Sequence, residues 1–154
     1  MKIGYVGAGT WGFALASLLA SNGHDLILWT SNIEFAQMLS KKREHPKLAR
    51  FKAHERVKFT SDLKEVLEGA EFLIESVTSM GIRPVFEQIL SLGNINCPIV
   101  VTSKGIEQNK KIKVSWYLLK IPDLFKIIKM HCRSAYAVIR LMPLAQQCND
   151  RSFA

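Results

Sequence analysis

The hydrophobic positions of the first 105 residues fall into short apolar runs separated by segments with helical spacing. Apolar runs of about four to eight residues between turn residues are typical of buried parallel strands. Such runs predict strands at residues 2–6, 25–29, 57–60, 71–77 and 98–102. Helices are predicted between them, at residues 11–22, 33–42, between Ser61 and Gly69, and at 83–92.

This alternation predicts an α/β fold, a doubly wound parallel sheet of Rossmann-like type with right-handed crossovers. The strand order is 3-2-1-4-5 if the chain reverses direction after the third strand. A ligand cleft then lies at the carboxyl ends of strands one and four. Four polar or glycine-rich turns follow strand ends and should converge there: Gly7–Gly12, Thr30–Asn32, Thr78–Ser79 and Ser103–Lys104.

The turn after the first strand carries glycines in the spacing G-x-G-x-x-G, at Gly7, Gly9 and Gly12. In a dinucleotide site the first glycine permits a tight turn, and the second lets backbone N–H groups approach a pyrophosphate. The third glycine lets the helix pack closely on the strand. The free N–H groups and the positive end of the following helix then face the phosphates. A glycine-rich turn without a ligand is the alternative, and the strand–turn–helix context favours the dinucleotide site.

The segment from Lys41 to Arg56 is basic and irregular, and it contains His45 next to Pro46. It predicts a long loop or broken helix, and long loops in compact domains are often functional. His45 could contact a cofactor or lie exposed at the surface, and both interpretations stay open. The carboxylate that binds the adenine ribose in many such folds is missing, because Thr30–Asn32 occupies its place. Arginine is absent there too, so the choice between NAD and NADP stays open.

Charge divides the chain of 154 residues, whose net charge is +8, into two parts. Residues 1–109 carry 12 Lys/Arg and 11 Asp/Glu, a balance of +1, whereas residues 110–154 carry 9 and 2, a balance of +7. All nine glycines lie at or before Gly105. We therefore predict a dinucleotide-binding domain over residues 1–109 and a basic tail of uncertain structure over residues 110–154.

The three cysteines (Cys97, Cys132 and Cys148) have no metal-ligand spacing, and their odd number argues against a disulfide framework. We expect no metal site and a reduced, cytoplasmic location. We also expect no transmembrane segment, because no run of about 20 uncharged apolar residues occurs. The tail could form a basic amphipathic segment on an anionic membrane, but Pro122 would interrupt it. We expect neither stable membrane contact nor nucleic-acid binding.

Several motifs occur in the order typical of one family. Gly7–Gly12 followed by Ala-Leu-Ala is similar to a G-A-G-[ST]-W-G-x-A-L-A loop, and Leu28-Trp29 to an L-W strand end. His45-Pro46 is similar to a basic H-P loop, Val77–Ser79 to a V-[PT]-[SA] turn, and Ser103–Glu107 to an S-K-G-I-E signature. Residues 1–109 thereby resemble the N-terminal domain of bacterial-type NAD(P)-dependent glycerol-3-phosphate dehydrogenase.

The resemblance implies reduction of dihydroxyacetone phosphate to glycerol 3-phosphate with NAD or NADP, for phospholipid synthesis. It implies that Thr10 and Trp11 contact the cofactor and that Lys104, the catalytic candidate, contacts both substrate and cofactor. The full set of expected cofactor contacts is Gly7, Gly9, Thr10, Trp11, Gly12, Phe13, Ser31, His45 and Lys104. Hydride delivery to a ketone leaves an alkoxide that needs a cation or acid, which Lys104 could supply. A solvated surface lysine is the alternative. Phe13 departs from the small residue common in this family.

Nothing in residues 110–154 resembles the C-terminal helical domain of that family, which carries a catalytic lysine and the asparagine-rich substrate site. The simplest hypothesis is a truncated or frameshifted product with a non-native tail, inactive by itself. A homodimer would need the missing domain. The alternative is a non-catalytic NAD(P)-binding module, for example a sensor, held at a membrane surface by its basic tail.

Overall fold

The computed structural model describes residues 1–93, 95, 97–103, 106–107, 112–113 and 127–129. Its parallel sheet contains β1 (Lys2–Val6), β2 (Asp25–Trp29), β3 (Val57–Thr60), β4 (Phe72–Glu75), β5 (Ile99–Val101) and β8 (Ile127–Lys129). The helices are α1 (Thr10–Ser21), α2 (Ile33–Lys42), α3 (Leu63–Leu67) and α4 (Ser79–Leu92). A separate antiparallel pair joins β6 (Ile106–Glu107) to β7 (Ile112–Lys113).

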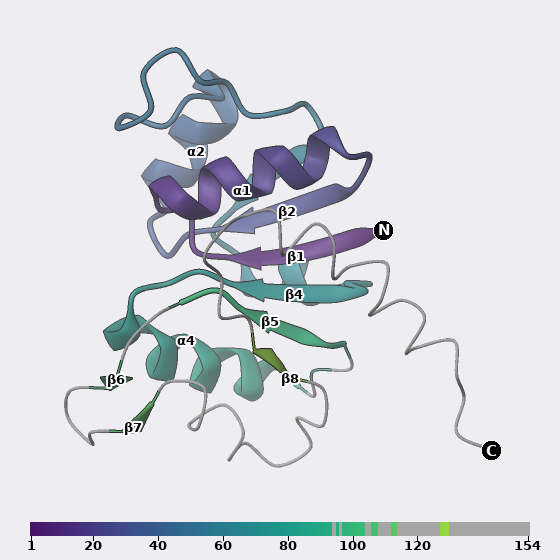
Figure 1. Ribbon diagram of the computed structural model, residues 1–154, viewed down its shortest axis with the longest axis vertical. Coiled ribbons are helices and arrows are strands. Elements are labelled where there is room, and N and C mark those ends of the chain that lie inside the picture. The colour runs from purple at the N-terminus through teal and green to yellow at the C-terminus, as the bar shows by residue number, and fades with distance from the viewer. Residues whose placement is uncertain (94, 96, 104–105, 108–111, 114–126, 130–154) are drawn as a thin grey trace.

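The strands lie in the order β3-β2-β1-β4-β5-β8 (Figure 1). This confirms the predicted doubly wound, Rossmann-like fold and the predicted order of its first five strands. Because the chain changes direction after β3, β1 and β4 are neighbours, and Val6 lies opposite Glu75. The switch point of the sheet, where ligands bind in such folds, therefore lies at the carboxyl ends of these two strands.

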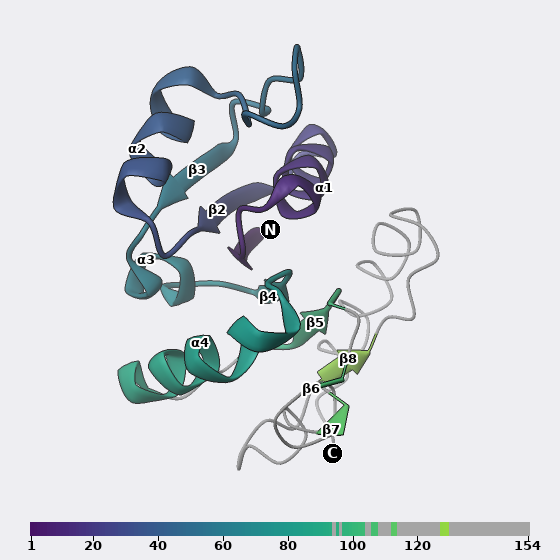
Figure 2. The same cartoon turned by 90° about the vertical axis from the view of Figure 1, so that its left-hand side faces the viewer.

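Helices cover both faces of the sheet, with α1 on one face and α3 and α4 on the other (Figure 2). Alternate residues of β1 point to opposite faces. Tyr5 belongs to a core cluster with Phe13 and Leu19 of α1, whereas Val6 belongs to a second cluster with Phe86 of α4. The helix α2 contributes Leu39 to the first cluster. Two apolar layers thus hold the central strands rigidly under the loops at their carboxyl ends.

The helix α4 differs from its prediction at the start. It begins at Ser79 and includes Gly81 and Pro84, whereas the sequence predicted a strand to Val77 and a helix from Arg83. Glycine and proline usually interrupt a helix, but α4 contains both, and Pro84 lies inside the helix. β4 ends at Glu75 and α4 begins at Ser79, so the turn between them is short.

Strands β6, β7 and β8 were not predicted. β8 pairs in parallel with β5, so the sheet extends into the part of the chain predicted as a basic tail. Most of residues 110–154 lies outside the described residues, and the predicted boundary at residue 109 stays a prediction. Within the described ranges there is no helix long and apolar enough to cross a membrane.

Candidate functional site

The glycine loop is held to the rest of the sheet by its first and third glycines. Gly7 has φ +111°, and its N–H donates to the carbonyl of Trp29 at 3.0 Å. A Cβ on Gly7 would lie 2.5 Å from the carbonyl oxygen of Ser76, and a Cβ on Gly12 would lie 2.0 Å from the carbonyl oxygen of Gly7. The fold itself therefore requires glycine at both positions.

Gly9 is different, because a Cβ there would meet no atom within 4 Å. It is the N-cap of α1, with an extended backbone (φ −67°, ψ 175°). Among the described residues no side chain caps α1, and its first turn contains no acidic residue. The first N–H groups of α1 thus remain available to an anion, which the helix dipole also favours. The open space above Gly9 has the form expected of a phosphate cradle.

A hollow of about 420 Å³ opens beside this loop. It joins the glycine loop, the end of β2, the helix α2 and the basic loop after it. The lining residues are Ala8, Gly9, Thr10, Thr30, Phe35, His45, Pro46 and Lys47. Two of the segments that the sequence placed at one edge, those of Gly9 and Thr30, therefore do meet, and the loop that carries His45 joins them. Among the described residues that line this hollow none is acidic, and Lys47 contributes a positive charge.

His45 is only 6% exposed, so its interpretation as an exposed loop residue is wrong. Its ring lies 5.6 Å from each of the rings of Phe13 and Phe35, and its Nδ1 accepts the N–H of Lys47 at 3.1 Å. Burial, and then the charge of Lys47, lower the pKa of His45. The neutral ring consequently carries its proton on Nε2, which can donate a hydrogen bond.

Phe13 lies behind His45 rather than in the hollow. Its side chain is 1% exposed and stacks on Phe59 at 5.8 Å, with Phe51 at its edge at 6.1 Å. Its N–H donates to Gly9 within the loop, at 2.8 Å. The large ring thereby fills the space beneath His45, and a direct cofactor contact of Phe13 stays a prediction.

The basic loop is fixed by Arg43, which the sequence did not single out. Arg43 ends α2 with φ 55°, and its guanidinium donates to the carbonyls of Ala53 (3.4 Å), Val57 (3.1 Å) and His54. The Ala53 N–H donates back to the Arg43 carbonyl at 2.7 Å. This one side chain closes the loop that presents His45, and only its position at the end of a helix beside a long loop could have indicated the role.

At the end of β2, most polar groups are engaged in local structure. Asn32 caps α2 by accepting the N–H of Phe35 at 2.8 Å, and the Thr30 N–H donates to Thr60 at 3.0 Å. Ser31 is exposed and has no hydrogen-bond partner among the described residues. Its expected cofactor contact stays a prediction, as do those of Thr10 and of Trp11, which is 48% exposed on α1.

The carboxyl end of β4 holds a buried acid that the sequence analysis missed. Glu75 is 0% exposed, its Oε1 accepts the N–H of Val77 at 2.7 Å, and its Oε2 has no partner among the described residues. Burial raises the pKa of Glu75 to about 7. Ser103, after β5, contacts the same Oε1. Lys104, the next residue, lies outside the described residues, and its predicted role stays a prediction.

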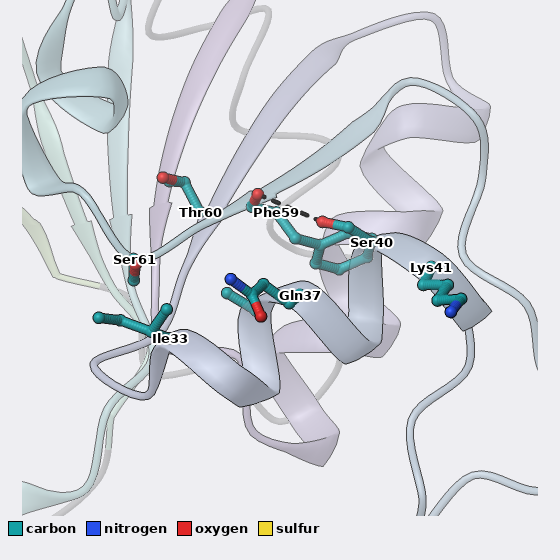
Figure 3. A pocket seen from close by; sticks show the side chains of 8 residues that line it. Ile33, Gln37, Ser40, Lys41, Phe59, Thr60 and Ser61 are labelled. Atoms are coloured by element: carbon teal, nitrogen blue, oxygen red, sulfur yellow. Dashed lines mark hydrogen bonds between the residues drawn. The ribbon is translucent and has the colours of Figure 1, made fainter.

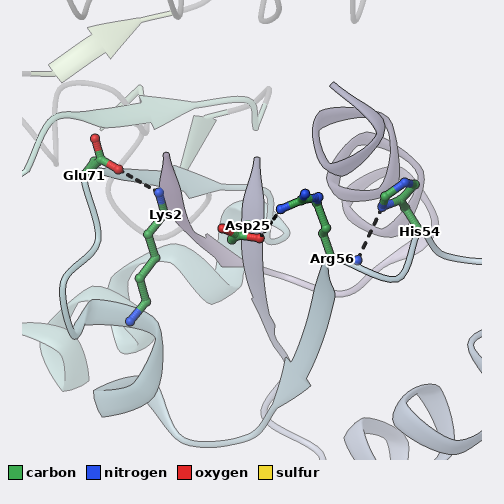
Figure 4. Close-up of polar contacts among 5 residues, drawn as sticks. All are labelled: Lys2, Asp25, His54, Arg56 and Glu71. Atoms are coloured by element: carbon green, nitrogen blue, oxygen red, sulfur yellow. Dashed lines mark hydrogen bonds and ion pairs between the residues drawn. The ribbon is translucent and has the colours of Figure 1, made fainter. Parts of the chain in front are cut away.

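Two further polar regions lie apart from the glycine loop. One is a second hollow of about 420 Å³ between α2 and β3, lined in part by Gln37, Ser40 and Ser61 (Figure 3). The other is at the amino ends of the strands, where Arg56 pairs with Asp25 at 3.0 Å (Figure 4). Neither includes a residue of the predicted site, and the second lies at the edge opposite to it.

Comparison with known proteins agrees with the geometry. The sequence profile described as the N-terminus of NAD-dependent glycerol-3-phosphate dehydrogenase matches residues 2–123. The chain belongs to this family. It corresponds to the N-terminal, NAD-binding part, and the cofactor class of the family is NAD or NADP.

Curated relatives include the glycerol-3-phosphate dehydrogenases [NAD(P)+] of Protochlamydia amoebophila, 55% identical over 108 residues, and Chlamydia muridarum, 44% identical over 119 residues. These matches cover 70% and 77% of this chain but only 32% and 36% of the relatives, so the chain spans about a third of their length. The structure of the Coxiella burnetii enzyme has the same fold, with a TM-score of 0.72 at 23% identity, covering 83% of this chain and 39% of that one.

Proposed function

We propose that this chain binds NAD or NADP beside the Gly7–Gly12 loop and serves as the cofactor-binding part of a glycerol-3-phosphate dehydrogenase. The observation that carries the proposal is the open space at Gly9, flanked by the free N–H groups of α1 and by the hollow. An anionic pyrophosphate fits such a cradle because it needs N–H donors and no Cβ in the way.

In this proposal several residues of the hollow each make a different contact with the dinucleotide. The N–H groups of Thr10 and Trp11 bind the phosphates, and the Nε2–H of His45 donates a hydrogen bond into the hollow. Lys47 supplies positive charge at the rim. The bound cofactor would supply the hydride, and Lys104 would stabilise the alkoxide that forms on the ketone. Dihydroxyacetone phosphate is the proposed substrate, glycerol 3-phosphate the product and the cytoplasm the proposed location.

A direct test is a titration of the full chain with NADH and NADPH, followed by tryptophan fluorescence. Trp11 lies half exposed on the first turn of α1, so we expect quenching on binding, and a Trp11→Phe variant should lose most of that signal. The ratio of the two affinities decides between NAD and NADP. If neither nucleotide changes the fluorescence or the thermal stability of the chain, the proposal is wrong.

The second candidate function is a non-catalytic NAD(P)-binding module. It is supported by the described loop and hollow, whose features suit nucleotide binding. Binding is common to both candidates, so only turnover separates them. NADH oxidation in the presence of dihydroxyacetone phosphate would favour the dehydrogenase, and binding without turnover would favour the module.

A further inference from the structure

A buried carboxyl group links two turns at the carboxyl edge of the sheet. The Glu75 Oε1 accepts the N–H of Val77 and lies 2.5 Å from the Oγ of Ser103. The same Ser103 Oγ also contacts the carbonyl oxygen of Val77. Val77 belongs to the turn after β4, and Ser103 follows β5. The three residues therefore join neighbouring strand ends beside the switch point.

A count of protons indicates the charge state of this network. A serine hydroxyl has one proton to donate, yet the Ser103 Oγ lies against two acceptors, the Glu75 carboxyl and the Val77 carbonyl. If Glu75 is ionised, only one of these contacts is a hydrogen bond. If Oε1 carries a proton, Glu75 donates to Ser103 and Ser103 donates to Val77, so both contacts are satisfied.

The second carboxyl oxygen supports the same conclusion. Oε2 of Glu75 is buried without a hydrogen-bond partner among the described residues. Leaving a neutral carbonyl oxygen in that position costs much less free energy than leaving a charged carboxylate oxygen there. The buried environment therefore favours the neutral acid.

The turn that this network holds packs directly against the glycine loop. The Ser76 N–H donates to the Val6 carbonyl at 2.8 Å, and the Ser76 carbonyl occupies the space that a Cβ on Gly7 would need. A shift of this turn would therefore move the first glycine of the loop. Ionised Glu75 would also place a negative charge in a region of low dielectric near the proposed phosphate cradle.

We propose that Glu75 is a proton-linked positioning residue, whose neutral form holds the turns after β4 and β5 and whose ionisation weakens dinucleotide binding. This rests on the proposed dinucleotide site. Burial raises the pKa of Glu75 to about 7, so both forms occur near neutral pH. Tyr5 of β1 lies close enough to feel this charge, but burial raises its pKa too and keeps it neutral. The other described side chains of the network and its surroundings, Val77, Thr102 and Ser103, do not titrate here.

The test is a titration of the full chain with NADH between about pH 6 and pH 8. NADH is the probe because it lacks the 2′-phosphate, which itself titrates in this range. We expect the dissociation constant of the wild type to rise roughly fivefold with pH, and that of Glu75→Gln to stay constant. Glu71→Gln is the matched control. Glu71 is exposed and lies just before the amino end of β4 (Figure 4), whereas Glu75 is buried at the carboxyl end. Glu71→Gln should keep the wild-type pH dependence.

Infrared spectroscopy gives a second readout that needs no nucleotide. The wild type and Glu71→Gln should show the band of a protonated carboxylic acid near pH 6, and Glu75→Gln should lack it. A wild type without this band overturns the inference even if the variant does not fold. NADH binding with the same pH dependence in wild type and Glu75→Gln also overturns it and leaves the proposed function intact. Absence of NADH binding by the wild type at every pH would overturn both proposals.

Discussion

At the scale of single residues, the three glycines of the loop serve two purposes. Gly7 and Gly12 have backbone atoms where a Cβ would lie, whereas Gly9 faces open space. A Cβ at Gly9 therefore conflicts with a ligand and not with the described protein atoms. Gly9 has a negative φ, so an alanine or valine can adopt its backbone conformation.

We predict that Gly9→Val folds normally and loses dinucleotide binding, with Gly9→Ala intermediate. The branched side chain would occupy the space that the pyrophosphate needs, and its Cβ would have no described protein atom within 4 Å. Fluorescence titration with NADH measures the affinity, and thermal unfolding reports the fold. Unchanged affinity in a folded Gly9→Val protein would show that the phosphates bind elsewhere. As the matched comparison, Gly12→Ala should lose at least about 2 kcal/mol of unfolding free energy, because its Cβ would overlap the Gly7 carbonyl.

Glu75 should also make stability depend on pH. Burial raises its pKa from the ordinary 4.5 to about 7, so the folded protein binds this proton more tightly than the unfolded chain does. The resulting stabilisation is complete below about pH 4.5 and is lost as the pH rises through 7. We predict that the unfolding free energy of Glu75→Gln, relative to wild type, increases from about pH 5 to pH 8 by up to about 3 kcal/mol. Urea unfolding at several pH values measures this difference. A difference that does not vary with pH would contradict the raised pKa.

At the scale of structural elements, Arg43 makes several of the contacts that hold the basic loop after α2, beside a Glu44–Lys52 ion pair and a Ser17–His54 hydrogen bond. Arg43 donates to three backbone carbonyls of residues 53–57, and its guanidinium lies 5.7 Å from the centre of the Phe59 ring. The loop that it closes carries His45 and Lys47 into the hollow. The geometry of this loop is therefore fixed in part by hydrogen bonds from the end of α2.

We predict that Arg43→Met lowers the unfolding free energy by about 2 kcal/mol and speeds hydrogen exchange in residues 44–56. Methionine keeps the apolar stem but leaves the three carbonyls without their donor. Arg50→Met is the matched control, because Arg50 also has positive φ but is exposed and has no partner among the described residues. Equal effects of the two substitutions would show that Arg43 does not hold the loop.

The elements differ in how far the sequence could predict them. Strands β1 to β5 were predictable because each is a short, largely apolar run, and their order followed once the chain was taken to reverse direction after the third strand. The start of α4 was missed because Gly81 and Pro84 are ordinarily signals that end a helix. β8 depends on pairing with the distant β5, which a three-residue run cannot specify.

The candidate site was predictable only in part, for a similar reason. Gly7, Gly9 and Gly12 have a spacing that reflects their geometry, so the loop could be recognised along the chain. The burial of His45 depends on aromatic rings from α1 and α2, and that of Glu75 on the turn after β5. Such contacts join residues far apart in sequence, and no local pattern encodes them.

At the scale of the whole molecule, cofactor binding and catalysis make different demands. Binding needs the loop and the hollow, which lie within residues 7–47. Catalysis also needs a ketone held against the cofactor and a cleft that excludes water. The chain spans about a third of the length of its curated relatives.

We predict that residues 1–154, expressed by themselves, bind the dinucleotide but do not turn over dihydroxyacetone phosphate appreciably, because the described residues that line the hollow account for a bound cofactor and not for a bound ketone. The measurement is NADH oxidation by the purified chain, with Lys104→Ala as the control variant. Turnover near the typical enzyme rate of about 10 per second, abolished in Lys104→Ala, would contradict this prediction.

The different roles of the three loop glycines also determine which substitutions such a sequence would accumulate during evolution. In a lineage that kept this fold but no longer used the cofactor, substitutions at Gly7 and Gly12 would still be removed, because they damage the folded chain. Substitutions at Gly9 would accumulate freely, because the protein itself does not need glycine there. A library of loop variants selected for folding alone should retain the outer two glycines and randomise the middle one. Selection for nucleotide binding should restore it, so Gly9 serves as a genetic marker of cofactor use.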